Sequence, residues 1–255
     1  MLLQVNNITH AFTYNNFFKK HEKQILNNIS FQVEQGKNVA LIGASGCGKS
    51  TIAKIIAQLQ KPKSGNILFL NNPIILKNIT QKRKFYKQVQ ILFQDPLSSL
   101  NPRYNVLENL QEPLHYLLNI NDIDSQLKKI YPIFDKLELS QSMLYYYPMM
   151  LSGGQAQRVC IARMLLVEPL FVILDETTSG LDCKLQHDIW NFFINTQETH
   201  NTTFLFITHD ITLAHKYCEK IILMDKGSII ETIKANESFK SSLGKEIEKC
   251  FDSVL

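Results

Sequence analysis

The segment GASGCGKST, residues 43–51, constrains the fold of this chain more than any other stretch of its sequence. It matches G-x-x-x-x-G-K-[ST], a pattern that is informative when a strand precedes it and a helix follows. The apolar run 38–43 predicts a strand buried on both faces. The helix after the loop is predicted by apolar residues at helical spacing, namely Ile52, Ile55, Ile56 and Leu59. This order predicts an α/β fold with a phosphate-binding loop.

The residue types in the loop predict ATP and Mg²⁺ as its ligands. Glycines let the backbone approach phosphate oxygens, and the start of the helix adds its positive dipole end. The amine of Lys49 is expected to reach the β and γ phosphates, and the hydroxyl of Ser50 to ligate Mg²⁺. The predicted nucleotide contacts are Gly43, Ala44, Ser45, Gly46, Cys47, Gly48, Lys49, Ser50 and Thr51. Cys47 is either a reactive thiol or a small residue that contributes only its backbone.

A second apolar run, FVILDE at 171–176, ends in two carboxylates. Asp175 is placed to hold Mg²⁺ through water, and Glu176 to polarise an attacking water as general base. Acidic strand ends are common, so this signal becomes strong only beside the loop at 43–51.

LSGGQAQR, residues 151–158, is another glycine-rich turn that leads into a helix and offers N–H groups to an anion. The first loop already binds the nucleotide of its own subunit. A head-to-tail pair, in which Ser152 and Gly154 face ATP bound on the other subunit, explains why one chain carries both.

These motifs, with TSGLD at 178–182 and THD at 208–210, resemble the ATP-binding subunits of ABC transporters. The resemblance implies a P-loop NTPase of RecA-like type, with a mostly parallel sheet, an N-terminal antiparallel β subdomain and an inserted helical subdomain. It also implies nucleotide contacts from Ser152, Gly153, Gly154, Gln155 and Asp182.

The same resemblance gives catalytic roles to two further residues. Gln94 is implied as a Mg²⁺ ligand that also couples hydrolysis to the membrane, and His209 as a contact to the γ-phosphate. The alternative for His209 is an ordinary surface residue at the end of a strand. Phe12 matches the aromatic that stacks on adenine, with Tyr14 as the second choice.

QDPLSSLNPR, residues 94–103, resembles the extension after this glutamine in peptide and nickel importers. Its prolines predict a stiff, irregular connector. LSGGQAQRVCIARMLLVEP and FLFITHD resemble a nickel-importer ATPase. The implied function is ATP-driven import of nickel or a metal chelate, with a dipeptide importer as the alternative. Implied partners are two permeases, a related second ATPase and an extracytoplasmic binding protein, at the cytoplasmic face of the cell membrane.

Composition weighs against several other classes. No apolar run approaches the roughly 20 residues of a membrane span. The five scattered cysteines favour reduced thiols over a structural metal, and the mild net charge of +4 does not suggest nucleic acid. A soluble ABC ATPase acting on DNA or ribosomes stays a less favoured alternative. A P-loop GTPase or kinase leaves LSGGQ unexplained.

The chain is expected to form one ABC domain. Residues 1–93 and 168–232 form the predicted core with its antiparallel strands, 94–167 the helical insertion, and 233–255 a tail. Helices are expected near 105–119, 123–137, 153–167 and 182–198. Residues 2–12 and 25–33 read as paired strands, separated by a basic loop at 13–24 that is either solvated or faces anionic lipid.

Overall fold

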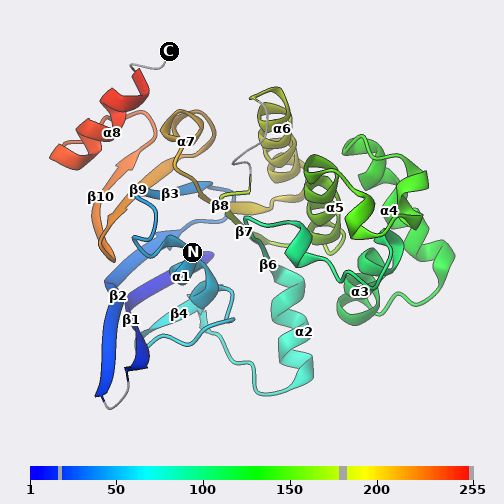
Figure 1. Ribbon diagram of the computed structural model, residues 1–255, viewed down its shortest axis with the longest axis horizontal. Helices are drawn as coiled ribbons and strands as arrows, with labels where there is room; N and C mark the ends of the chain where they lie inside the picture. The colour runs from blue at the N-terminus through cyan, green and yellow to red at the C-terminus, as the bar shows by residue number, and fades with distance from the viewer. Residues whose placement is uncertain (17–18, 178–182, 253–255) are drawn as a thin grey trace. The chain divides into compact units, whose positions relative to one another are not determined.

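The structure is a computed structural model that describes residues 1–16, 19–177 and 183–252 (Figure 1). For residues 14–16, 19–20, 183–185 and 251–252 it describes the backbone alone. The chain divides into two compact units, residues 1–74 with 193–255, and residues 75–192, and each is described by itself. Asp182 lies outside the described residues.

The first unit contains an antiparallel sheet with the order β2-β1-β4-β5. Its strands are β1 (Leu3–Asn16), β2 (Lys19–Val33), β4 (Ser64–Phe69) and β5 (Asn72–Pro73). The predicted pair is confirmed, but the predicted loop at 13–24 is wrong, because the strands stay paired as far as Asn16 and Lys19. Backbone hydrogen bonds hold such a ribbon whatever its side chains, so a polar sequence gives no apolar period to reveal it.

A second group of strands in this unit has the order β10-β9-β3-β8. They are β3 (Val39–Gly43), β8 (Thr203–Ile207), β9 (Lys220–Asp225) and β10 (Ser228–Lys234). β3 pairs in parallel with β8 and β9, while β9 and β10 form a hairpin through Lys226 and Gly227. The continuous apolar runs of β3 and β8 are typical of strands covered on both faces.

Three helices lie in the first unit, α1 (Lys49–Ile56), α7 (Ile211–Tyr217) and α8 (Ser242–Asp252). In Figure 1, α1 and α7 lie on opposite sides of β3. Ile52, Ile55 and Ile56 are buried as predicted. The placement of Leu59 in the buried stripe is wrong, since α1 ends at Ile56 and a left-handed Gln58 (φ 59°) leaves Leu59 53% exposed.

The second unit holds the parallel pair β6 (Val89–Leu92) and β7 (Phe171–Asp175). Its helices include α3, α4 and α5, which Figure 1 groups together, and the predictions near 105–119, 123–137 and 153–167 are confirmed. The helical elements are α2 (Ile79–Gln88), η1 (Leu97–Ser99), α3 (Val106–Leu118), α4 (Ile123–Lys136), η2 (Gln141–Tyr145), η3 (Pro148–Met150), α5 (Gly153–Leu165) and α6 (Cys183–His200), of which α6 crosses the division at Phe193.

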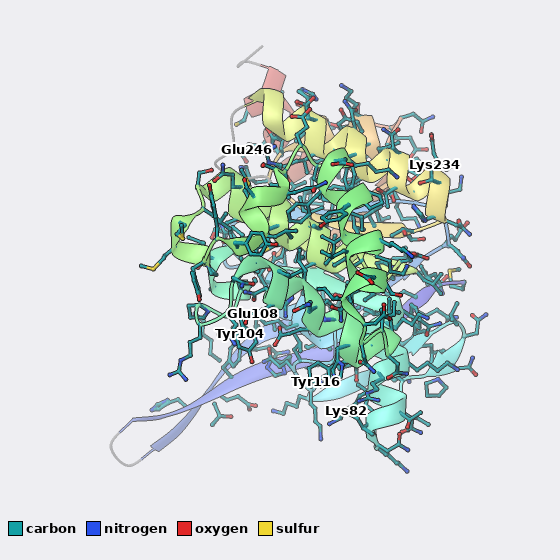
Figure 2. All side chains as sticks on the ribbon, turned by 90° about the vertical axis from the view of Figure 1, so that its right-hand side faces the viewer. Lys82, Tyr104, Glu108, Tyr116, Lys234 and Glu246 are labelled. Atoms are coloured by element: carbon teal, nitrogen blue, oxygen red, sulfur yellow. The ribbon has the colours of Figure 1, made fainter. Side chains whose placement is uncertain are left out.

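The predicted helical segment 94–167 lies wholly inside the second unit. Figure 2 looks onto the helices of this unit, with Tyr104 just before α3 and Glu108 and Tyr116 on it. Its core is apolar and includes Val106, Leu110, Ile130 and Phe134, all fully buried. Among the described residues, no helix is both long and apolar enough to cross a bilayer. The predicted α/β class, with separate antiparallel and mostly parallel strand groups, is confirmed.

Candidate nucleotide-binding site

The loop after β3 has a backbone that requires glycine at two positions. Gly43 has φ 152°, and a Cβ there would lie 2.2 Å from the carbonyl oxygen of Met224. Gly48 has φ 112°, and a Cβ there would lie 2.7 Å from the Leu26 side chain. Any larger residue would therefore displace β9 or β2, which explains the glycine pattern in structural terms.

Helix α1 begins without a side-chain cap. Its N-cap is Gly48, which has no side chain to bond the first turn, and a helix start of this kind suits an anion. Ser45, Gly46 and Ser50 are exposed, as a nucleotide site requires. This arrangement has the donor pattern predicted for a phosphate cradle.

Lys49 lies folded against the same loop. Its side chain is 5% exposed, and its ammonium donates to the carbonyl oxygens of Gly43 at 2.8 Å and Ala44 at 3.0 Å. A buried cation is stable only with such partners. The loop thus fixes the charge close to the N–H groups that would face the phosphates.

Cys47 is a packing residue within the loop. It is 6% exposed, and its carbonyl oxygen accepts a hydrogen bond from Gly227 N at 3.0 Å. Burial raises the pKa of its thiol, and the opposing effect of nearby Lys49 is smaller. The thiolate is therefore disfavoured, which supports the interpretation of Cys47 as a small residue over a reactive nucleophile.

His209 lies at the same edge of the strand group as the loop. β3 and β8 run parallel with Leu41 opposite Ile207, and Thr208 N donates to Leu41 O at 3.3 Å. Two residues beyond this pair come Gly43 on one strand and the exposed His209 on the other. The carboxyl ends of parallel strands are where α/β proteins bind ligands, so this position suits the functional reading of His209.

Phe12 presents an open aromatic ring on β1. It is 46% exposed, and its ring meets that of His10 edge-on, with centroids 5.1 Å apart. An exposed ring braced from one side can stack on a nucleobase. The side chain of Tyr14, the second choice, is not among those described.

The second unit brings Gln94, Asp175 and Glu176 to one edge. Leu92 of β6 pairs with Leu174 of β7, so Gln94 and Glu176 follow these strands at the same level. Asp175 is 4% exposed, whereas Gln94 is exposed. Glu176 has φ 50°, a left-handed conformation that is uncommon outside glycine and turns the chain sharply at the strand end.

The signature turn begins α5 with a capping box. Ser152 is the N-cap, its hydroxyl oxygen accepts from Gln155 N at 3.3 Å, and Gln155 Oε1 accepts from Ser152 N at 2.9 Å. This leaves the N–H groups of Gly153 and Gly154 as the open donors of the first turn. A Cβ on Gly153 would meet nothing within 4 Å, so the turn faces open space.

The predicted metal ligands suit Mg²⁺ in chemical type. Ser50, Gln94 and Asp175 provide a hydroxyl, an amide and a carboxylate oxygen, which are hard donors. Mg²⁺ bound together with nucleotide phosphates takes only one or two carboxylates from the protein and keeps several waters. A single carboxylate in this set fits that ion.

One residue that supports the loop was not predicted. Gly227, in the β9–β10 turn, donates to Cys47 O and accepts from Asn27 N at 2.7 Å. It lies 180 residues from Cys47 in the sequence, and its only local signal is a turn glycine (φ 77°). A contact so distant along the chain leaves no periodic pattern.

Comparison with known proteins agrees with this arrangement. The sequence profile described as ABC transporter matches residues 26–179. A dimeric ATP-binding cassette, MJ0796, in a post-hydrolysis state bound to ADP and Pi, has a similar structure, with TM-score 0.84 and 27% identity over 92% of this chain and 100% of that one. The fold and the motifs define an ABC-type ATPase, and the chain belongs to the ABC transporter family.

Among its relatives is the nickel import ATP-binding protein NikE of Escherichia coli O6:K15:H31 (strain 536 / UPEC), 39% identical over 250 residues, which are 97% of this chain and 93% of that protein. Another is cbiO1 from Clostridium perfringens, part of the ABC transporter complex cbiONQ, with TM-score 0.77 and 27% identity over 100% of this chain and 95% of that one. The predicted family and importer-type ATPase assignment are confirmed.

Proposed function

We propose that this chain is the ATP-hydrolysing subunit of a membrane importer for nickel or a nickel-containing chelate, attached at the cytoplasmic face of the cell membrane. The observation that supports this proposal is that one chain holds two differently built glycine-rich helix starts. The first, at Gly48, is uncapped and has Lys49 beside it. The second, at Ser152, is capped, has no lysine and leaves two open donors.

The second turn needs a phosphate supplied by another subunit. Two such chains, or this chain and a related ATPase, paired head to tail would each offer Ser152, Gly153 and Gly154 to ATP bound at the other's phosphate loop. This accounts for both turns without a second nucleotide site in one subunit. Asp182 belongs to the same proposed contact set.

Each site residue has a proposed task. Lys49 and the loop amides stabilise negative charge on the β and γ phosphates, and the Phe12 ring stacks on adenine. Ser50, Gln94 and Asp175 hold Mg²⁺, which supplies charge neutralisation when bound. Glu176 accepts a proton from the attacking water, and His209 donates a hydrogen bond to the transferred phosphate.

The partners are two permeases, a related second ATPase and an extracytoplasmic binding protein. A groove in the second unit offers a docking place for a cytoplasmic segment of a permease. It has a volume of about 350 Å³ and lies among β6, α3 and α5, and its lining includes Tyr116, which is 56% exposed. Aromatic residues are enriched at protein–protein interfaces.

Nickel as the solute rests on likeness to nickel import proteins at 39% identity. The segment at 94–103 resembles peptide importers as well, so a dipeptide system is the second candidate. Growth of a deletion strain that depends on nickel uptake, supplied separately with nickel, cobalt and dipeptides, separates the two. Restoration by excess nickel supports the proposal, and restoration by dipeptide alone overturns it.

The ATPase chemistry has its own test. Glu176→Gln should abolish turnover, yet retain ATP in a stable dimer on gel filtration, because only the general base is removed. Asp188→Asn, on the exposed part of α6, serves as a control that keeps turnover. Undiminished hydrolysis in Glu176→Gln would falsify the assignment of the base.

A further inference from the structure

The segment after Gln94 is held by side chains of two helices. Between residues 95 and 105 the only regular element is the short turn η1 (Leu97–Ser99). Inside it, Asp95 accepts from Leu97 N at 3.1 Å, and Ser98 Oγ donates to Asp95 O at 3.0 Å. These local bonds shape the turn, but they do not attach it to the rest of the unit.

Two residues of α5, one helical turn apart, attach η1. Cys160 Sγ donates to Pro96 O at 3.2 Å, and Arg163 Nη1 donates to Ser99 O at 2.7 Å. Burial raises the pKa of Cys160 to about 12, so its thiol keeps the proton that this bond needs. Both acceptors are backbone oxygens. That of Pro96 also accepts from Ser99 N at 3.1 Å within η1, so Cys160 and Arg163 attach both ends of this short helix to α5.

The far end of the segment is attached to α3. Asn109 is fully buried; its Oδ1 accepts from Asn101 N at 2.8 Å, and its amide donates to the carbonyl oxygens of Asn101, Tyr104 and Asn105. A buried amide that makes all these bonds holds its partners rigidly. Helix α5 thus holds the first part of the segment, at Pro96 and Ser99, and α3 holds the rest, from Asn101 to Asn105.

Arg163 differs from Cys160 and Asn109 because it links the segment, α5 and α3 at once. Its Nη2 pairs with Glu112 Oε2 at 2.7 Å, and the two side chains are 30% and 32% exposed. Both line the groove described above, together with Ser99 and Cys160. A group that enters the groove and competes for Glu112 or Arg163 therefore acts directly on the hydrogen bond to Ser99.

We propose that Arg163 is a positioning residue that fixes the segment after Gln94 and, through Glu112, makes that position sensitive to what occupies the groove. This rests on the proposed function only for the identity of the occupant, a permease segment. The planar guanidinium suits the task, since one side chain bonds a carboxylate and a carbonyl oxygen at once. Lysine has a single nitrogen and cannot keep both geometries.

The first measurement is hydrogen–deuterium exchange on the purified full chain, without nucleotide. In Arg163→Gln the amides of Ser99 and Leu100 should exchange about tenfold faster, the scale of one lost charged hydrogen bond. The amide of Asn101, held by Asn109, should stay slow, as should those of α3 and α5. Arg163→Lys should lie between the wild type and Arg163→Gln.

Paired variants separate the anchor from the ion pair. Glu112→Gln removes the ion pair and leaves the bond to Ser99, so exchange should rise about threefold at most. The charge-swapped double variant, Glu112→Arg with Arg163→Glu, restores opposite charges, but a carboxylate at position 163 has no hydrogen for Ser99 O. Hydrogen–deuterium exchange at Ser99 and Leu100 should therefore stay fast in this variant. Lys129→Gln, which breaks the ion pair with Glu168 in the same unit, is the matched control and should change nothing in this segment.

ATP turnover provides the second readout. Arg163→Gln should lower kcat by about tenfold and leave KM for ATP within about twofold, because it displaces Gln94 and not the phosphate loop. Three results would each overturn the positioning role: slow hydrogen–deuterium exchange in Arg163→Gln, slow exchange restored in the charge-swapped double variant, or faster exchange of α3 and α5 together with the segment. Absence of turnover in the wild type would instead count against the proposed function, and the exchange result would stand.

Discussion

The two glycine-rich helix starts look alike in sequence but are built for opposite situations. At the start of α1 a glycine with φ 112° is the N-cap and makes no side-chain cap, and the Lys49 ammonium bonds the loop carbonyl oxygens. At the start of α5 a serine and a glutamine close a capping box. The first has the features that we propose for an anion site. The second is already stabilised as a helix end and offers few donors, in keeping with its proposed role beside a phosphate bound by another subunit.

Among the variants that test this comparison, the largest effect is expected from Lys49→Ala. The loop then keeps its amides but loses the cation that lies against it, and kcat/KM for ATP should fall by about 100-fold or more. Lys54→Ala, an exposed lysine in the last turn of α1, is the control and should hydrolyse ATP normally. Equal losses in both variants would mean that general charge matters and the loop geometry does not.

Gly154→Asp should stop turnover almost as completely, by about 100-fold, because a carboxylate would meet the phosphate of the neighbouring subunit. Binding of ATP to its own phosphate loop should stay within about twofold. Mixing this variant with Lys49→Ala should recover part of the activity, since one of the two composite sites is then intact. No recovery on mixing would contradict the head-to-tail pair.

Gln155 tests whether the second turn is a cap or a nucleotide contact. Gln155→Ala should cost about 1 kcal/mol of unfolding free energy through loss of the capping box, seen as a Tm lower by about 3 °C. Gln155→Glu retains the box and should restore Tm. If it also lowers ATP turnover, the side chain faces phosphate; unchanged turnover would limit Gln155 to a capping role.

The smallest effect concerns Cys47, in the phosphate loop before α1. Because burial raises the pKa of its thiol, the thiolate fraction at neutral pH is below that of an ordinary cysteine. Alkylation by iodoacetamide, followed by peptide mass spectrometry, should be slow at pH 7 and still rise above pH 9. The exposed Cys250 serves as the internal control. Rapid labelling of Cys47 at pH 7 would restore the reactive-thiol interpretation.

The sequence predicted those parts of the site that local backbone chemistry dictates. Glycines with positive φ, the strand-to-helix order and carboxylates at a strand end can each be read within ten residues, and Gly43, Gly48 and Asp175 are found where they were expected. The roles of the candidate site residues stay predictions, because neither the fold nor the family tests them.

Other features had no local signal. Helix α2 (Ile79–Gln88) is mostly charged and polar, with Phe85 its one buried residue, so an apolar stripe could not be seen. The sequence of the paired segments 13–16 and 19–24 is mostly polar and shows no apolar alternation. Arg163 lies 64 residues from Ser99 and its role depends on tertiary contact. Such features follow from the assembled fold, which brings distant residues together.

The contact between the phosphate loop and the β9–β10 turn has a consequence for biosynthesis. Gly227 N holds Cys47 O, Met224 O lies against Gly43, and both belong to the last fifth of the chain. A ribosome that has released only the first 200 residues presents the loop sequence without the strand that supports it. Nucleotide affinity should therefore arise late in translation, after nearly all of the chain has emerged, which keeps unfinished chains from sequestering ATP or pairing with mature subunits.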